Sequence, residues 1–364
     1  MNYILKKSFY TSLLLVTLQH TSIAQATKYH SDPDIEFKLA KEYYLKEQYS
    51  LAYPIFKNLA NNISDNSRLP LSTQLEAKYY NIVSGLKLDE NTAEVQAKEF
   101  IKSEYNAPRV QMLSYQLGEY YFRHENFEEA NIYYEKSGID NLSNREIAEM
   151  KFHQAYGYFT LKHFDKARPL FNSIRQIQSD PNYLDANYYF GFISFYEKDY
   201  NLALEAFRKV ENEPTYQTIV PYYIAEILYF SGEKDKAINY AENKLKAGGQ
   251  YYELQMRQLI GHSYFEKKNY ASALPYLEAY VSKTDKVRRE DLYELSYTYY
   301  ETKHLEKAIE GFKQLGGKED SLAQNSMYLL ADSYLKVGQK GNARNAFLFC
   351  AANSSNLLQK EVSK

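Results

Sequence analysis

The chain has 364 residues, with 44 Lys and Arg against 46 Asp and Glu, a net charge of -2 and a pI near 6.4. This balance, without a block of like charge, argues against a phosphate-binding surface and a polybasic membrane anchor, so no nucleic-acid partner is expected. Cys350 is the single cysteine, which excludes an internal disulfide, a thiolate metal cluster and a Cys-x-x-Cys redox pair. A chain of this length forms two or three domains or one repeat array, because a single core stops growing near roughly 250 to 300 residues.

The first 24 residues have the pattern of a secretory signal peptide. Lys6 and Lys7 form a basic start, and an apolar stretch follows over about residues 8–18. The apolar stretch is too short to span a bilayer as a helix, which needs about 20 residues. Small residues lead up to a predicted cleavage site between Ala24 and Gln25.

The mature chain is therefore predicted to be exported, to the periplasm of a Gram-negative host or to the outside. No cysteine lies near the cleavage site, so a lipoprotein anchor is not expected. Residues 25–33 are predicted to be a short flexible N-terminus. No later apolar stretch is long enough for a membrane span.

Residues 34–353 carry one pattern that recurs about every 36 residues. It starts with a small residue, found at Ala40, Gly118, Ala155, Gly191, Ala225, Gly261, Ser296 and Ala331. From Gly118 onward the spacing is 34 to 37 residues. Alanine follows twelve positions after each, at Ala52, Ala130, Ala167, Ala203, Ala237, Ala273, Ala308 and Ala343. A fixed period between 20 and 50 residues is typical of repeat architectures.

Each repeat is predicted to be a pair of helices. Tyrosine most often stands three positions after the small residue, and an aromatic residue most often stands four positions after the alanine. Spacings of three, four and seven place such residues on one helix face. Short polar turns, such as 46–48 and 197–199, separate the two halves. We expect the small residue to let the two helix backbones approach closely, while the aromatic residue fills the space beside it.

These units resemble tetratricopeptide repeats. Gly118, Tyr121, Ala130 and Tyr134 match the family pattern of small residue, Tyr, Ala and aromatic residue. The Trp that members often carry before the small residue is absent. The region 75–105 has room for one more unit but fits the pattern poorly. The prediction is an all-α solenoid of about nine repeats, the second degenerate, and the resemblance implies a right-handed superhelix.

Residues 354–364 follow the ninth repeat and allow two interpretations. Leu357, Leu358 and Val362 could form a short cap over the last apolar surface, which a helical array needs. The same segment also has the pattern of the opening of a further first helix.

The resemblance implies that the residues three before and four after each small residue line the concave side of the array. Aromatic residues occupy fourteen of these sixteen positions: Phe37, Tyr44, Tyr115, Phe122, Phe152, Phe159, Tyr188, Phe195, Tyr222, Tyr229, Phe265, Tyr293, Tyr300 and Tyr328. Gln258 and Leu335 occupy the other two. A stripe of this kind suits an extended peptide, a partner helix or a sugar chain. Because aromatic residues are common here throughout the family, packing between helices is the favoured explanation of the stripe, and a continuous binding surface is the alternative.

No catalytic, metal or cofactor site is predicted. The chain lacks H-E-x-x-H, Walker-type, G-x-S-x-G and G-x-G-x-x-G motifs. His124, His163 and His304 fall in turns of different repeats, so they are expected to be solvated and not to share a metal ion. Cys350 is expected to be a buried, inert thiol.

These patterns favour a non-enzymatic scaffold of the cell envelope that docks a protein partner along the aromatic stripe. The alternative hypothesis is a glycan-binding protein that uses the same groove. The partner and the oligomeric state are left open by the sequence.

Overall fold

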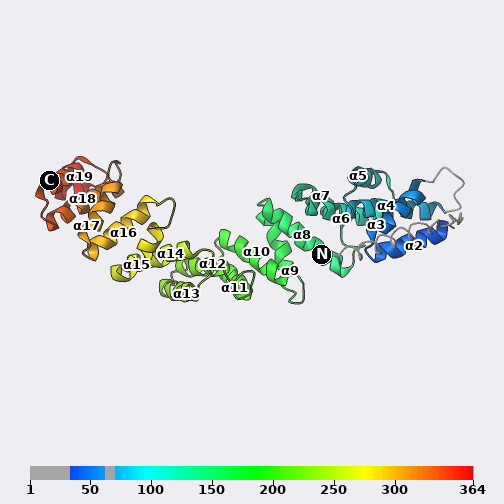
Figure 1. The fold of residues 1–364 in the computed structure, drawn as a ribbon, viewed down its shortest axis with the longest axis horizontal. Coiled ribbons are helices and arrows are strands. Elements are labelled where there is room, and N and C mark those ends of the chain that lie inside the picture. Colours follow the sequence, from blue (N-terminus) through cyan, green and yellow to red (C-terminus); the bar gives the residue numbers. More distant parts are fainter. Residues whose placement is uncertain (1–32, 62–69, 364) are drawn as a thin grey trace, which may run out of the picture. The chain divides into compact units, whose positions relative to one another are not determined.

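The computed structural model describes residues 33–61 and 70–363. Within these ranges the chain forms nineteen helices, α2 to α20, and no strand (Figure 1). The all-α repeat fold predicted from the sequence is therefore confirmed. The predicted signal peptide and its cleavage site between Ala24 and Gln25 lie outside the described residues and stay predictions.

Eighteen of the helices form nine hairpins, in which we call the first helix the A helix and the second the B helix. The hairpins are α2 (Pro33–Leu45) with α3 (Tyr49–Asn61), α4 (Leu71–Lys87) with α5 (Ala93–Ser103), α6 (Ala107–Arg123) with α7 (Phe127–Ser137), α8 (Asn144–Thr160) with α9 (Phe164–Ile174), α10 (Tyr183–Tyr196) with α11 (Tyr200–Val210), α12 (Val220–Phe230) with α13 (Lys234–Ala247), α14 (Glu253–Glu266) with α15 (Tyr270–Val281), α16 (Arg289–Glu301) with α17 (Leu305–Leu315), and α18 (Ser321–Lys336) with α19 (Lys340–Ala352). A last short helix, α20 (Leu357–Val362), follows.

The hairpins belong to two compact units, Met1–Asn141 and Leu142–Lys364. The described part of the first unit holds hairpins one to three, and the second unit holds hairpins four to nine with α20. Within each unit the B helix of one hairpin packs against the A helix of the next, as α3 does on α4 and α17 on α18. Figure 1 shows this succession for α10 to α19 in the second unit. Each hairpin thus uses its neighbour to cover an apolar face that it cannot bury alone.

One residue in every hairpin turn has a left-handed backbone. Seven of the nine are not glycine and have φ between 56° and 66°: Glu47, Asp89, Glu125, Lys162, Lys198, Lys268 and Lys303. Gly232 and Gly338 take this place in the other two turns. The next residue then donates its backbone N–H to a carbonyl five positions earlier, as Asp199 does to Ser194 at 2.8 Å. This bond closes the end of the A helix, so the turn has the same form in every repeat.

The turn also gives the register of the degenerate second repeat. Its closing bond runs from Glu90 N–H to the Gly85 carbonyl at 2.9 Å, which places Ile82 where other repeats carry the small residue. On the B helix, buried Ala93 stands eleven residues after Ile82, one short of the usual twelve, and fully buried Ala97 follows four residues later, where an aromatic residue is usual. The second repeat thus has a large side chain at the usually small position of the A helix and a small one at the usually aromatic position of the B helix, so the sequence pattern fails here.

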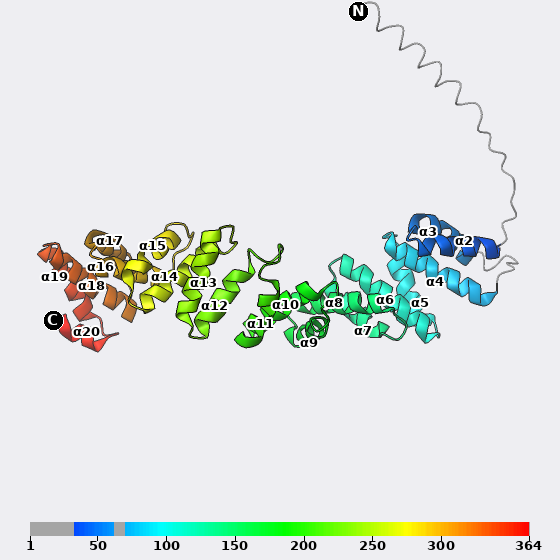
Figure 2. The same ribbon diagram turned by 90° about the horizontal axis from the view of Figure 1, so that it is seen from below.

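Helix α20 is tied to the last hairpin by side-chain amides. Its N-cap Asn356 accepts the backbone N–H of Gln359. The fully buried Gln324 on α18 donates to the carbonyl of Asn356 at 2.9 Å and accepts the backbone N–H of Asn356 at 2.5 Å. Figure 2 shows α20 beside α18 and α19, which it contacts. Asn356 stands 36 residues after Asp320, the N-cap of α18, so α20 begins where the A-helix spacing places it.

The small residue of each A helix does lie against the B helix, as predicted. A Cβ atom added to Gly118 would stand 2.6 Å from Cδ1 of Tyr134, which is almost completely buried. At Gly191 it would stand 3.0 Å from Cδ1 of Phe207. The two backbones are therefore close enough that an aromatic ring of the B helix fills the space above the small residue.

Gly118→Ala should destabilise the protein by about 1 to 3 kcal/mol, because the added methyl group must displace the ring of Tyr134. Urea unfolding followed by circular dichroism measures the effect. Gly341→Ala is the matched control: nothing lies within 4 Å of its added methyl group, and alanine is the better helix former by about 0.5 to 1 kcal/mol. Equal stability of the two variants would contradict this account of the close contact.

Candidate partner-binding face

The A helices share a face whose contacts recur from repeat to repeat. We define this A-helix face by five positions: three and two residues before the small residue, and one, four and five residues after it. The fourteen aromatic residues predicted as the stripe lie on it. Tyr115 is buried, with 4% of its surface exposed, and the other thirteen are half-buried. None of them presents a largely exposed ring.

Residues three before the small residue pack inside their own hairpin. Their rings contact the B-helix aromatic residue, with centroids 5.7 to 6.3 Å apart, in Phe37–Phe56, Phe152–Phe171, Tyr188–Phe207, Tyr293–Phe312 and Tyr328–Phe347. Aromatic pairs at these separations stabilise a fold by about 0.5 to 1.5 kcal/mol beyond the contribution of the surface area that they bury. These five stripe residues therefore hold the two helices of a hairpin together.

Residues four after the small residue pack across the turn. Their rings lie 5.5 to 6.1 Å from the first residue of the B helix, in Tyr44–Tyr49, Phe122–Phe127, Phe159–Phe164, Phe195–Tyr200 and Phe265–Tyr270. The pair fixes the angle at which the chain enters the B helix. Of the four remaining stripe residues, Tyr115 is buried, and Tyr222, Tyr229 and Tyr300 donate their hydroxyl groups to carboxylates.

Neighbouring A helices of the second unit contact each other through this face. In four of the five neighbouring pairs, the residue four after the small residue contacts the residue one after the next small residue, through either a ring pair or a hydrogen bond. The contacts are Phe159–Phe192 at 5.5 Å, Phe265–Tyr297 at 5.7 Å, Tyr229 to His262 at 2.9 Å, and Tyr300 to Asp332 at 2.5 Å. The A-helix face is thus continuous between repeats.

On the A-helix face, two aromatic residues outside the predicted stripe have largely exposed rings. Tyr196 and Phe230 stand five after the small residue, and 66% and 54% of their surfaces are exposed. Tyr196 packs edge-on against Phe164 at 5.2 Å, and Phe230 stacks on Tyr200 at 5.8 Å. Each exposed ring is therefore held by a ring of the preceding repeat. The available signal was their position, one residue beyond the predicted stripe.

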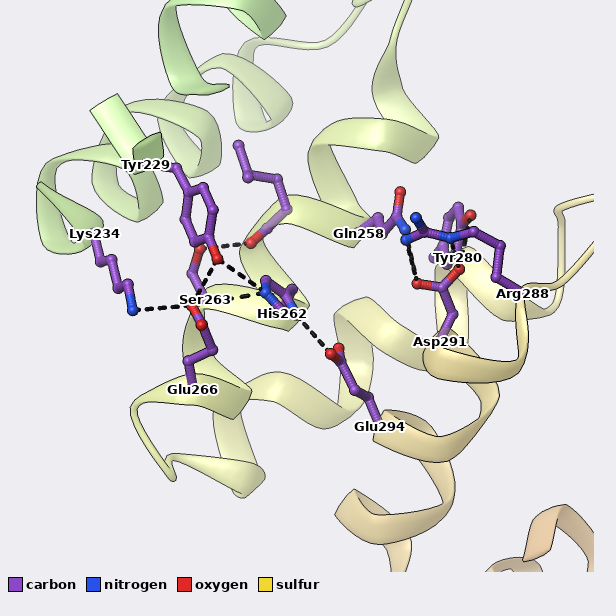
Figure 3. A network of polar contacts seen from close by, with 11 residues as sticks. Tyr229, Lys234, Gln258, His262, Ser263, Glu266, Tyr280, Arg288, Asp291 and Glu294 are labelled. Atoms are coloured by element: carbon purple, nitrogen blue, oxygen red, sulfur yellow. Dashed lines mark hydrogen bonds and ion pairs between the residues drawn. The ribbon is translucent and has the colours of Figure 1, made fainter. Parts of the chain in front are cut away.

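His262 connects three repeats through a polar cluster (Figure 3). Its Nδ1 lies 2.6 Å from Glu294 on α16, and its Nε2 lies 2.9 Å from the Tyr229 hydroxyl on α12. Tyr229 also donates to Glu266 at 2.8 Å, and Lys234 on α13 pairs with the same carboxylate at 3.0 Å. The hydrogen bond to Glu294 raises the pKa of His262 above its ordinary value of 6.5, against the effect of burial.

A second cluster in Figure 3 surrounds Asp291, which is 4% exposed. Arg288 donates two hydrogen bonds to its carboxylate, both at 2.8 Å, and Gln258 from the preceding repeat donates a third at 2.8 Å. Burial raises the pKa of Asp291, but the bonds from Arg288 and Gln258 outweigh burial and lower it. Gln258, one of the two non-aromatic stripe positions, therefore serves to link two repeats.

Other candidate sites are few. The described residues contain no group of three or more His, Cys, Asp or Glu that could hold a metal ion. Among the same residues no helix combines the length and apolarity that crossing a bilayer requires. Cys350 is fully buried, and His124, His163 and His304 are exposed in turns, both as predicted.

A depression of about 870 Å³ lies away from the A-helix face, beside the connection between α9 and α10. Its lining includes Ile147, Ile174, Ile177 and Pro181. Nothing in the repeat pattern indicated it.

Comparison with known proteins agrees with the hairpin geometry. Residues 266–350 match the family model of the anaphase-promoting complex (cyclosome) subunit 3, ANAPC3. No curated protein matches the chain.

Among solved structures, the C-terminal part of a TPR repeat-containing protein from Cytophaga hutchinsonii is 16% identical, covers 69% of this chain and 99% of its own, and gives a TM-score of 0.52. The apo form of RapI is 16% identical, and the match covers 90% of this chain and 99% of RapI with a TM-score of 0.43. A tetratricopeptide repeat protein from Parabacteroides merdae is 16% identical, and the match covers 79% of this chain and 97% of that protein with a TM-score of 0.40.

The chain has the all-α repeat fold of tetratricopeptide-repeat proteins, as the hairpin geometry and the similarity to the Cytophaga hutchinsonii structure show. This family is generally a non-enzymatic fold for protein interaction.

Phe195→Ala should cost about 2 to 3 kcal/mol of stability, because it removes a half-buried ring that closes a turn. Its neighbour Tyr196→Ala should cost less than about 1 kcal/mol, because that ring is mostly exposed. Urea unfolding of the two variants measures the difference. If both variants were equally stable, the division between turn-closing and exposed rings would be wrong.

Glu294→Gln should lower the pKa of His262 toward 6.5, because it removes the charged acceptor. Histidine NMR signals titrated between pH 5 and 9 measure it, with His262→Gln to assign the signal. Glu290→Gln on the same helix is the control and should leave the pKa unchanged. Since the pKa is raised in the folded state, the ion pair stabilises the fold fully below pH 6.5 and is lost as the pH rises through the folded pKa.

Proposed function

We propose that this protein is an exported scaffold of the cell envelope that docks a polypeptide partner along its A-helix face. The observation that carries the proposal is the pair of exposed, preorganised rings, Tyr196 and Phe230. Each ring is fixed by an aromatic neighbour, so a partner can bury it at small cost in conformational entropy. Exposed aromatic anchors of this kind dominate the energetics of protein interfaces.

Neighbouring polar groups support a polypeptide as the partner. The same face carries a tyrosine hydroxyl and two carboxylates over the sixth to eighth repeats, at Tyr229, Glu266 and Glu294. A protein segment can place apolar and polar side chains along both regions at once. Export is proposed from the leader pattern of residues 1–24 alone.

Sugar binding is the competing function. Rings such as Tyr196 and Phe230 can also stack on sugar faces, although the chain contains no Trp. The two functions predict different molecules in contact with the same two side chains.

Photo-crosslinking in the native host separates these functions. A photoreactive phenylalanine analogue is placed at Tyr196 or Phe230, and in a control chain at Leu348, which is 57% exposed on the B helix α19. We expect both face positions to capture the same envelope protein and the control position not to capture it.

Equal capture at Leu348 would contradict docking on the A-helix face. Retention of the purified chain on envelope polysaccharide, lost in the double variant Tyr196→Ala and Phe230→Ala and without any protein adduct, would favour glycan binding.

A further inference from the structure

The A-helix face is acidic in the last four repeats. At its five defined positions, α12, α14, α16 and α18 carry the carboxylates Glu226, Glu266, Glu294, Glu301 and Asp332. The basic groups at these positions are Lys336 and His262. The whole chain is nearly balanced, with a net charge of -2, so negative charge is concentrated here. Such a surface attracts cations.

Two of these carboxylates show how the face holds a cation. Lys336 Nζ lies 2.6 Å from Asp332 and 4.0 Å from the centroid of the Tyr300 ring. The Tyr300 hydroxyl donates to the same carboxylate. Lys234 likewise lies 3.0 Å from Glu266 and 5.8 Å from the ring of Tyr229, which donates to Glu266. In both places a carboxylate and the tyrosine bonded to it share one ammonium group.

Glu226 has the carboxylate and the tyrosine but no such cation. Tyr222 donates to it at 2.6 Å, and among the described residues no lysine or arginine forms an ion pair with it. Glu226 occupies the same repeat position as Asp332, one after the small residue. Four residues further on, the chain carries Phe230 where the ninth repeat carries Lys336. The position from which Lys336 pairs with Asp332 therefore holds the apolar Phe230 in the helix of Glu226, so Glu226 has no lysine at this position of its own helix.

Three tyrosine rings gather next to Glu226. The ring centroids of Tyr222, Tyr223 and Tyr252 lie 4.9 to 5.8 Å from one another. All three rings and the carboxylate are half-buried, so a side chain from outside can reach them. Burial raises the pKa of Glu226, and the Tyr222 hydroxyl opposes this only in part. A cation that approaches Glu226 would stabilise its charged form, which burial disfavours.

We propose that Glu226, with Tyr222, Tyr223 and Tyr252, binds an arginine or lysine side chain of the partner polypeptide. A guanidinium group fits best, because it can stack on a tyrosine ring and donate two hydrogen bonds to a carboxylate. The exposed ring of Phe230 lies one helical turn away and takes an apolar side chain of the same segment. The proposal rests on the proposed function and defines the partner as a basic segment with an adjacent apolar residue.

A displayed library of random dodecapeptides, selected on the full mature chain, tests the proposal. We expect the selected peptides to be rich in arginine or lysine beside an apolar residue. One such peptide is then synthesised with a fluorescent label, and its Kd is measured by anisotropy. Glu226→Gln should weaken it about tenfold, as expected for loss of one charged contact. Glu306→Gln, an exposed change of equal charge on α17, should leave the Kd within about twofold.

Acidification provides a second readout that a purely structural role would not change. Binding to the wild type should fall as the pH drops through the raised pKa of Glu226, and the fall should be absent in Glu226→Gln. Circular dichroism confirms that the variant is folded.

The two proposals fail in different ways. Selected peptides that lack arginine and lysine but still need Tyr196 and Phe230 would overturn the cation site and keep the docking function. Peptides that bind Glu226→Gln as tightly as the wild type would also overturn the cation site. A library from which no peptide is enriched would contradict the docking function as well.

Discussion

The close contact between two helices at one small residue per repeat is the constraint on which the rest of the structure depends. At Gly118 the space for a Cβ atom is already taken by Tyr134, a ring that is almost completely buried and bonded to Glu119. Because this contact brings the A and B helices together, the turn between them must be short. That in turn forces one residue into the left-handed region, even where it is Lys198 or Lys268.

Much of the aromatic content follows from the same hairpin geometry. A residue three before the small residue, such as Phe152, completes the packing inside the hairpin, and one four after it, such as Phe159, closes the turn. These roles recur in both compact units, so they belong to the fold. In the function proposed above, recognition uses positions that the hairpin does not need, above all the fifth residue after the small one, at Tyr196 and Phe230.

The sequence predicted the hairpins well because their packing repeats, and repetition makes a weak local signal strong. Prediction from the sequence failed where a packing arrangement occurs in one repeat only. In the second repeat Ile82 and Ala97 exchange large and small side chains, and only the turn hydrogen bond of Glu90 reveals the register. The stripe was correctly placed on the A helices, but no spacing rule tells a half-buried ring from an exposed one. Nor does spacing show that Glu294, two before a small residue, reaches His262 in the preceding repeat.

The position one after the small residue shows how such a fold separates stability from specificity. It carries Phe192, Glu226, His262, Tyr297 and Asp332 in successive repeats of the second unit. Each of these residues lies on the A-helix face, and most contact the preceding A helix, yet their chemistry ranges from apolar to charged. Because the hairpin is already closed by other residues, a change here alters charge and shape without opening a cavity in the core. If the protein docks a polypeptide as proposed, each repeat can match one part of the partner through its own residue at this position.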